Sequence, residues 1–290
     1  MSSIHPGENS YMMDQESAVE MARLIDLDRL VTRYMGGLFP AALDTSRFHD
    51  ILDIASGPGG WALEVAFAHP KKRVVGIDIS NNMLAYARAQ ARVQGLKNVR
   101  FLYMDATSPL NFPDASFDFV NARFVSGFMW KEAWPKLLRE CMRIVRPGGF
   151  IRLTESDTAS TGVCNSLAAE RLNRLAVRAG YNTGRSFCPD PDSGYGGITP
   201  MLRWFLKQAG AQNICEQAFA LNYSVGTDGH AGVYNNLKVG MKLIQPFLLK
   251  TKVGTEEEIE QLYQEMLLEL SQDDFLGIWY FTSAYAQKLA

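Results

Sequence analysis

The stretch ILDIASGPGGW, from Ile51 to Trp61, constrains the fold of this chain more than any other feature. Its first residues are apolar apart from Asp53, which is typical of a parallel strand covered on both faces. Gly57 and Gly59 follow in a turn, where the missing Cβ atoms let a ligand approach the backbone. A helix that begins near Gly60 points its free N–H groups into the same space. The stretch therefore predicts a nucleotide-like ligand at the carboxyl end of a sheet.

Two later apolar runs also carry an acid at the position where a strand should end. The run from Val74 to Ile79 contains Asp78, and an acid at this strand tip can accept hydrogen bonds from both ribose hydroxyls. The run from Val99 to Ala106 repeats the pattern with Asp105. An acid at this third tip can meet the amino group of an adenine, so the three tips together predict a nucleoside-binding sheet edge.

In these segments the chain resembles the class I S-adenosylmethionine-dependent methyltransferases. Among them it is most similar to the small-molecule and quinone (UbiE-like) branch. The matching pieces cover roughly residues 45–155 and include DIASGPG at 53–59, GIDIS at 76–80, FDFV at 117–120 and RPGGF at 146–150. Ala55 departs from the family pattern, which has a glycine there, so we expect a modest shift of the turn. The resemblance implies S-adenosylmethionine as cofactor, contacted by Tyr11, Asp53, Ala55, Ser56, Gly57, Gly59, Asp78, Ile79, Met83, Asp105, Ala106, Asn121 and Arg123.

Three of these residues also have ordinary structural interpretations. Met83 falls in the first turn of the helix after the second strand, where it packs on the adenine or belongs to the core. Arg123 ends the fourth strand beside the glycine turn, at the switch point expected for methyl transfer, and either binds a carboxylate or is a solvated loop charge. Tyr11 closes over the methionine moiety if the amino-terminal arm covers the cofactor; otherwise the arm only packs on the sheet edge.

Candidate catalytic residues depend on the acceptor atom. A phenol or hydroxyl acceptor would benefit from a base with a pKa near neutral, and histidine suits that task. His230 is the histidine that falls in the segment expected to cover the substrate, within the flexible sequence GHAG, although it can equally be a solvated loop residue. Glu155, at the tip of the fifth strand, is the alternative base.

The order of strand and helix patterns predicts the fold class. Strand and helix alternate over residues 50–155, which predicts a parallel sheet with right-handed crossovers. We expect a doubly wound, seven-stranded, mostly parallel α/β sheet whose last strand is antiparallel. A capping box at Ser17 to Glu20 begins an amino-terminal helix. The predicted domains are an amino-terminal helical arm (1–45), a methyltransferase core (46–221 and 275–290) and a helical cap insertion (222–274), with Leu237, Met241, Ile244 and Leu248 on the inner face of the cap.

Composition narrows the class of substrate and the compartment. The formal net charge of −2 predicts no basic face, which argues against nucleic acid as a partner. The four cysteines are far apart and form no CxxC pair, so we expect no metal site and a reducing, cytoplasmic environment. No run approaches ~18 apolar residues, so no membrane span is expected. A small-molecule substrate is therefore expected, and a homo-oligomer stays open.

The expected function is methyl transfer to an O, N or C atom of a small organic molecule, mainly through proximity. A nicotinamide dehydrogenase is the alternative, because GPGG at 57–60 partly mimics a dinucleotide turn. Against it, Asp53 stands where a dehydrogenase usually has an apolar residue, and Ala62 replaces the third glycine. A non-catalytic cofactor-binding protein on the same fold is the other alternative.

Overall fold

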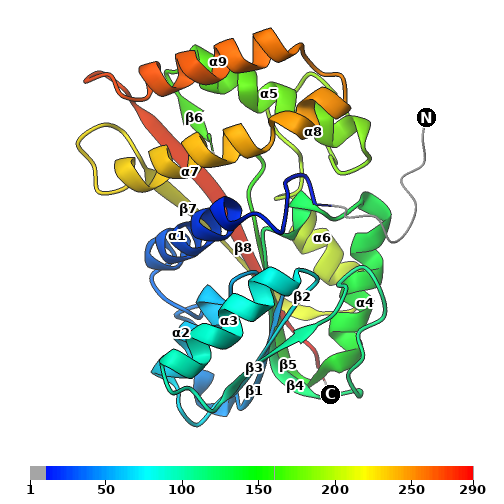
Figure 1. Ribbon diagram of the computed structural model, residues 1–290. Helices are drawn as coiled ribbons and strands as arrows, with labels where there is room; N and C mark the ends of the chain where they lie inside the picture. Colours follow the sequence, from blue (N-terminus) through cyan, green and yellow to red (C-terminus); the bar gives the residue numbers. More distant parts are fainter. Residues whose placement is uncertain (1–10, 160, 290) are drawn as a thin grey trace.

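The computed structural model describes residues 11–159 and 161–289, so the first ten residues of the predicted arm lie outside it (Figure 1). Its strands are β1 Asp50–Ile54, β2 Arg73–Asp78, β3 Val99–Tyr103, β4 Phe117–Arg123, β5 Val145–Glu155, β6 Val163–Cys164, β7 Gln212–Asn222 and β8 Gly277–Gln287. Its α-helices are α1 Ala18–Tyr34, α2 Gly60–Ala68, α3 Asn81–Val93, α4 Trp134–Ile144, α5 Leu167–Asn182, α6 Met201–Gln208, α7 His230–Leu243, α8 Gln245–Lys250 and α9 Glu256–Glu269.

These strands form one sheet with the order β3-β2-β1-β4-β5-β8-β6, and β7 pairs with β8 off this path. The first five strands pair in parallel, whereas β8 runs antiparallel to both β5 and β7. The predicted doubly wound sheet with a final antiparallel strand is therefore confirmed. The described sheet has an eighth strand, β6, which pairs with only two residues of β8 and is too short to leave a periodic signal in the sequence.

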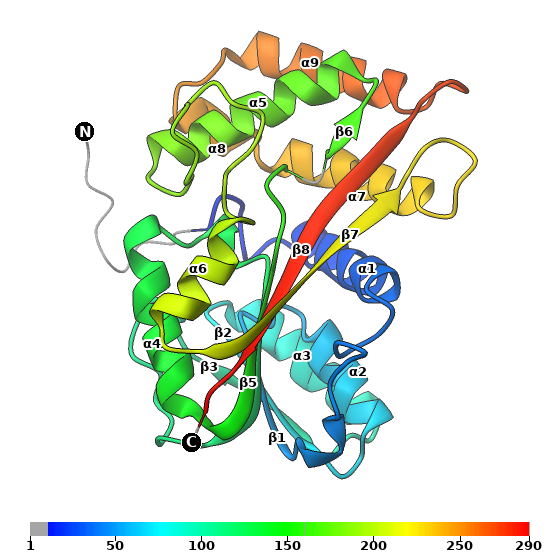
Figure 2. The same cartoon turned by 180° about the vertical axis from the view of Figure 1, so that it is seen from behind.

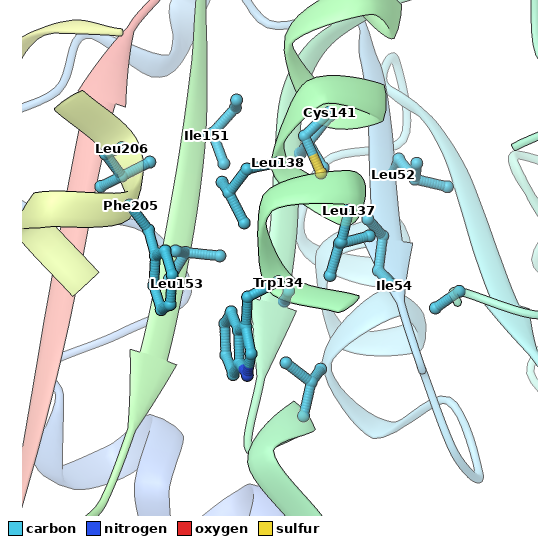
Figure 3. Close-up of a cluster of buried hydrophobic side chains, with 14 of the residues drawn as sticks. Leu52, Ile54, Trp134, Leu137, Leu138, Cys141, Ile151, Leu153, Phe205 and Leu206 are labelled. Atoms are coloured by element: carbon cyan, nitrogen blue, oxygen red, sulfur yellow. The ribbon is translucent and has the colours of Figure 1, made fainter. Parts of the chain in front are cut away.

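Alternation along the strands separates two apolar layers. Leu52 and Ile54 of β1 face the side covered by α4 and α6, where Trp134 stacks on Phe205 with ring centroids 5.3 Å apart (Figure 3). Ile51 belongs to the cluster under α2 and α3 on the opposite face. Because successive strand residues alternate between faces, Asp53 lies on the same side as Ile51. Asp53 of this strand therefore points to the same face of the sheet as Ile51, and we expect a ligand to approach it from that side.

A third apolar cluster forms a helical cap beyond the carboxyl ends of the strands, where α5, α7, α8 and α9 lie above the sheet (Figures 1 and 2). The predicted insertion at 222–274 contributes three of these helices. Helix α5 precedes it in the chain, yet Leu172 and Ala176 of α5 pack in the same cluster as Leu262 and Met266 of α9. The cap is therefore larger than predicted. Helices α7 and α8 follow each other with only Ile244 between them, and Pro246, which has no N–H to donate, stands in the first turn of α8.

The amino-terminal arm begins as the sequence indicated, with one difference. Ser17 caps α1 by accepting a hydrogen bond from the amide of Glu20. The reciprocal half of the capping box does not form, because the Glu20 carboxylate instead accepts hydrogen bonds from Arg23 and Tyr11. Helix α1 packs on α7 in the cap cluster, so the arm connects the cap to the sheet (Figure 1). None of the helices in the described part of the chain combines the length and apolar character of a membrane span.

Candidate functional site

A cavity of about 370 Å³ lies between the carboxyl ends of the strands and the cap. Its walls come from the tips of β1, β2 and β4, from α1 in the arm, and from α5 and α7 in the cap. The cavity thus joins the predicted ligand-binding sheet edge to the predicted substrate side. Eleven of the thirteen predicted cofactor residues line it: Tyr11, Asp53, Ala55, Ser56, Gly57, Asp78, Ile79, Met83, Asp105, Ala106 and Arg123.

The glycine turn adopts the left-handed backbone that its sequence suggests. Gly57 has φ +53°, and a Cβ atom added there would meet only Leu24, at 3.8 Å, so its open side faces the cavity. Ala55 adopts φ +54° although it is not glycine. Gly59 differs from the prediction: an added Cβ would lie 2.7 Å from Phe101 and 2.9 Å from Ala87. Gly59 does not line the cavity, so packing against β3 and α3 explains it better than ligand approach.

The two acids at the tips of β2 and β3 are held by the turns that follow them. Asp78 accepts hydrogen bonds from the amides of Gly57, at 2.8 Å, and Ser80, at 2.9 Å. Its burial raises the pKa of the carboxyl above the ordinary value. Asp105 accepts hydrogen bonds from the amide and hydroxyl of Thr107, both at 2.8 Å. Both side chains therefore reach the cavity in fixed orientations.

Asn121 lies behind the cavity wall, contrary to its predicted contact with the cofactor. It is fully buried, and its Nδ2 donates a hydrogen bond to Asp53 Oδ1 at 2.7 Å. Asp53 lines the cavity, and burial raises the pKa of its carboxyl to about 7. Asn121 thus supports a cavity residue and has no face toward the ligand.

The arm forms one wall of the cavity above the second strand. Leu24 and Leu27 of α1 line the cavity directly. Just before α1, the Gln15 carbonyl accepts a hydrogen bond from Ser80 Oγ at 3.2 Å, and the Glu16 carbonyl accepts one from Asn82 Nδ2 at 3.2 Å. These contacts tie the arm to the start of α3, beside Asp78.

A buried charged cluster joins the arm to the cap. The Tyr11 hydroxyl donates a hydrogen bond to Glu20 Oε1 at 2.7 Å. Arg23 binds the same carboxylate through two of its nitrogens. Arg23 Nη1 also donates to Asn236 Oδ1 of α7 at 2.7 Å. Burial raises the pKa of Tyr11 far above its usual value, so its phenol stays protonated at neutral pH. Tyr11 lines the cavity, and its hydroxyl is engaged by Glu20.

Arg123 is neither a solvated loop charge nor open to a ligand carboxylate. Its guanidinium forms an ion pair with Asp28 of α1 and donates a hydrogen bond to Thr32 Oγ1 at 2.9 Å. Both Arg123 and Asp28 line the cavity. The carboxylate that Arg123 binds is therefore the protein's own, and this pair fastens the arm to the tip of β4.

The two predicted bases do not reach the cavity in this structure. His230 Nε2 lies 2.9 Å from the Leu270 carbonyl, and its ring packs beside Tyr234 and Phe275 at the far end of the cap. Glu155 is fully buried and accepts hydrogen bonds from the Val125 amide, at 2.7 Å, and from Ser126 Oγ, at 2.6 Å. Glu155 holds the turn after β4. The geometry supports neither residue as the base.

The cap side of the cavity is mainly apolar. Leu237, Met241 and Ile244 line it as predicted, whereas Leu248 is buried in the cap cluster without reaching it. Further apolar lining comes from Leu24, Leu27, Phe124, Phe128, Ala159, Ala176, Val177 and Trp279.

Arg185 is a lining residue that the sequence did not indicate, because it falls in a loop rich in glycine, proline and polar residues. Its guanidinium lies over the rings of Trp130, at 5.5 Å, and Phe247, at 5.6 Å. Burial lowers its pKa to about 10, so it stays a cation at neutral pH.

Known proteins match the chain both along its length and over this site. A family model described as "Methyltransferase domain" matches residues 51–149. The methyltransferase pytC of Aspergillus terreus is 30% identical over 301 aligned positions, which cover 98% of this chain and 84% of that protein. The chain is a class I S-adenosylmethionine-dependent methyltransferase. The family predicted from the motifs is confirmed, and membership decides against the dehydrogenase alternative.

Three further proteins resemble the chain, one in part of its sequence and two in fold. A demethylmenaquinone methyltransferase of Thermus thermophilus is 43% identical over 105 residues, which cover 36% of this chain and 46% of that protein. Phosphoethanolamine N-methyltransferase 2 of Haemonchus contortus, solved with S-adenosyl-L-methionine, matches with a TM-score of 0.53 at 18% identity over 95% of this chain and 57% of that one. A methyltransferase structure from Bacillus halodurans matches with a TM-score of 0.54 at 18% identity, over 91% of this chain and 100% of that one. The structural likenesses concern the fold.

The lining of the methyltransferase cavity fits its cofactor. Gly57 leaves open space on the side where an added Cβ would stand, and the carboxylates of Asp53, Asp78 and Asp105 provide acceptors for hydroxyl and amino groups. Ser56 Oγ is buried at the cavity and has no hydrogen-bond partner within the described residues. A buried hydroxyl without a partner is uncommon, and a bound polar ligand would supply one.

Proposed function

We propose that this methyltransferase transfers the methyl group of S-adenosylmethionine to an O, N or C atom of a small, largely apolar organic molecule held beneath the cap. The observation that carries the proposal is the continuity of the cavity. Its sheet end has three carboxylates, and its cap end has a mainly apolar wall built by α1, α5 and α7. The first end suits a polar nucleoside, and the second suits an apolar acceptor.

Within this proposal the strand tips hold the cofactor. Asp78 would accept hydrogen bonds from the ribose hydroxyls, and Asp105 would accept one from the adenine amino group. Asp53 would face the ammonium group of the methionine moiety, because its carboxylate is the one beside the glycine turn on β1. Ile79 and Met83 supply apolar surface next to Asp78, where the adenine ring would pack.

The protein contributes to methyl transfer mainly by positioning the acceptor. The sulfonium of bound S-adenosylmethionine makes its methyl group electrophilic without help from a protein base. The cap residues then need to hold the acceptor in line and to exclude water, and proximity of this kind lowers barriers substantially. Because His230 and Glu155 both lie outside the cavity lining, we infer that the acceptor loses its proton without either of them.

Other features support a small acceptor and a reducing compartment. The net charge of −2 gives no basic face for a nucleic acid. All four cysteines are free in the structure, as expected for a cytoplasmic protein. The net charge and the free cysteines are both compatible with a homo-oligomer.

Gly180 of α5 offers a direct test, because it lines the cavity and an added Cβ would meet nothing within 4 Å. Gly180→Phe should fill the acceptor end without clashing at the Cβ position. The assay is transfer of isotopically labelled methyl from S-adenosylmethionine to low-molecular-weight, organic-extractable compounds, with calorimetry of S-adenosylhomocysteine in parallel. We expect lost transfer with unchanged S-adenosylhomocysteine affinity. Gly180→Ala, which adds one methyl group, is the matched control, and full transfer by Gly180→Phe would refute the placement of the acceptor.

A further inference from the structure

Three polar side chains form a row across the buried face of the sheet, behind the cofactor end of the cavity. Asp53, Asn121 and Arg152 occupy paired positions on the adjacent strands β1, β4 and β5. Arg152 Nε donates to Asn121 Oδ1 at 2.8 Å, and Asn121 Nδ2 donates to Asp53 Oδ1 at 2.7 Å. Of the three, Asp53 alone lines the cavity. The row therefore begins at a buried cation and ends at the cavity.

Arg152 sits in unusual surroundings for a charged residue. It is 1% exposed, and its guanidinium lies over the rings of Trp61, at 5.2 Å, and Phe119, at 5.6 Å. Its Nη1 donates to the Leu38 carbonyl at 2.8 Å, and its Nη2 has no partner within residues 11–159 and 161–289. No carboxylate of the described chain forms a salt bridge with it. Apolar residues often replace buried charges without loss of stability, so packing alone does not account for Arg152.

We propose that Arg152 is a positioning residue for cofactor binding, which acts through Asn121 to keep the Asp53 carboxylate ionised and aimed at the ammonium group of S-adenosylmethionine. The inference rests on the proposed placement of the cofactor. Its physical basis is the two-sided nature of an amide, which can present either its oxygen or its NH₂ to a neighbour. Because Arg152 can only donate, it fixes the Asn121 oxygen on its own side and leaves the NH₂ group facing Asp53.

The electrostatic effects of Asn121 and Arg152 on Asp53 also favour the ionised form of its carboxyl. Burial raises the pKa of Asp53, while the Asn121 hydrogen bond and the positive charge of Arg152 act to lower it, and nearby Asp78 acts to raise it. Arg123, which is paired with Asp28, is a second cation near this row, and its pKa is lowered by burial and by the charge of Arg152. Removing Arg152 should therefore raise the pKa of Asp53 further. A protonated Asp53 cannot pair with an ammonium group, so the cofactor should bind less tightly.

The test is calorimetric affinity for S-adenosylhomocysteine between pH 5.5 and 7.5, a range below the usual pKa of an α-amino group. Wild-type affinity should rise with pH up to about pH 7, because the pKa of Asp53 is about 7, and should rise less steeply above it. Asp53→Asn should bind more weakly with a flatter pH dependence, because the carboxyl that would pair with the ammonium group is gone. Arg152→Met should bind at least ~threefold more weakly at pH 7, and its affinity should rise as steeply between pH 7 and pH 7.5 as it does below pH 7, unlike that of the wild type. Phe119→Leu, which removes a buried neighbour of Arg152 outside the row, should lower the melting temperature and keep the wild-type profile.

Two results would overturn the inference. Arg152→Met with a lower melting temperature but the wild-type pH profile would make Arg152 a structural residue only. If Arg152→Met does not fold, Asn121→Leu decides instead, because it interrupts the row while keeping the cation, and a wild-type profile for Asn121→Leu would equally refute the relay. A failure of the cofactor placement would look different, since Asp53→Asn and Asp78→Ala would then bind S-adenosylhomocysteine as the wild type does.

Discussion

Ala55→Gly should make the protein more stable while changing cofactor affinity little or improving it. Ala55 is the position where the family has glycine, and its φ of +54° lies in the left-handed region. That conformation costs an L-residue about 1–2 kcal/mol. Glycine removes this cost, but it gives the unfolded chain extra freedom worth about 0.4–1 kcal/mol. The net expectation is a gain of about 0.5–1 kcal/mol, or about 1–2 °C in Tm for a chain of this size.

The chain contains a matched control for this experiment. Ala115 has φ +52° in the turn before β4 and does not line the cavity. Ala115→Gly should therefore stabilise the protein by a similar amount and leave the dissociation constant of S-adenosylhomocysteine unchanged. Ala66→Gly, in the buried middle of α2, should destabilise it by about 1 kcal/mol. Thermal melts and calorimetry measure both quantities. A loss of 1 kcal/mol or more in Ala55→Gly would refute the assignment of backbone strain to this turn.

Three further outcomes are expected. Gly57→Val should abolish binding of S-adenosylhomocysteine, because a β-branched residue is disfavoured at φ +53° beside the ligand; normal binding would make the turn purely structural. His230→Ala should lower kcat by less than ~threefold, because its ring contacts the Leu270 carbonyl away from the cavity; a ~100-fold loss would restore it as the base. Hydrogen exchange over α7 should slow when product and cofactor bind, and equal exchange in both states would indicate a rigid insertion.

The sequence predicted the sheet well because its signals are local. Each of the strand tips at Asp53, Asp78 and Asp105 lies in or after an apolar run, and a glycine turn follows Asp53 while a helix cap follows Asp78. Residues close in sequence set such geometry, so the strands and their acids could be placed without knowledge of the tertiary contacts. The right-handed connection rule then sets the hand of each crossover, whereas the strand order comes from the structure.

The parts that the sequence missed depend on contacts between distant segments. Helix α5 was assigned to the core, because nothing in its own periodicity shows that it packs on α9. The partner of Arg123 is Asp28, which is 95 residues away. The glycine-rich context of His230 suggests an exposed, flexible loop, but the residue begins α7 and its half-buried ring packs beside Phe275. Arg152 carried one local signal, a cation inside an apolar strand, and its role depends on Asn121 of the neighbouring strand.

The central claim is that S-adenosylmethionine binds at the strand tips, with Asp78 on its ribose. The direct measurement is the calorimetric dissociation constant of S-adenosylhomocysteine for wild type, Asp78→Ala and the exposed control Asp114→Ala, whose side chain is 79% exposed. Hydrogen bonds to a charged group contribute about 1.5–3 kcal/mol each. Asp78→Ala should therefore weaken binding at least ~tenfold while the thermal melt stays cooperative, and Asp114→Ala should bind as the wild type does. An unchanged dissociation constant for Asp78→Ala would contradict the placement of the cofactor.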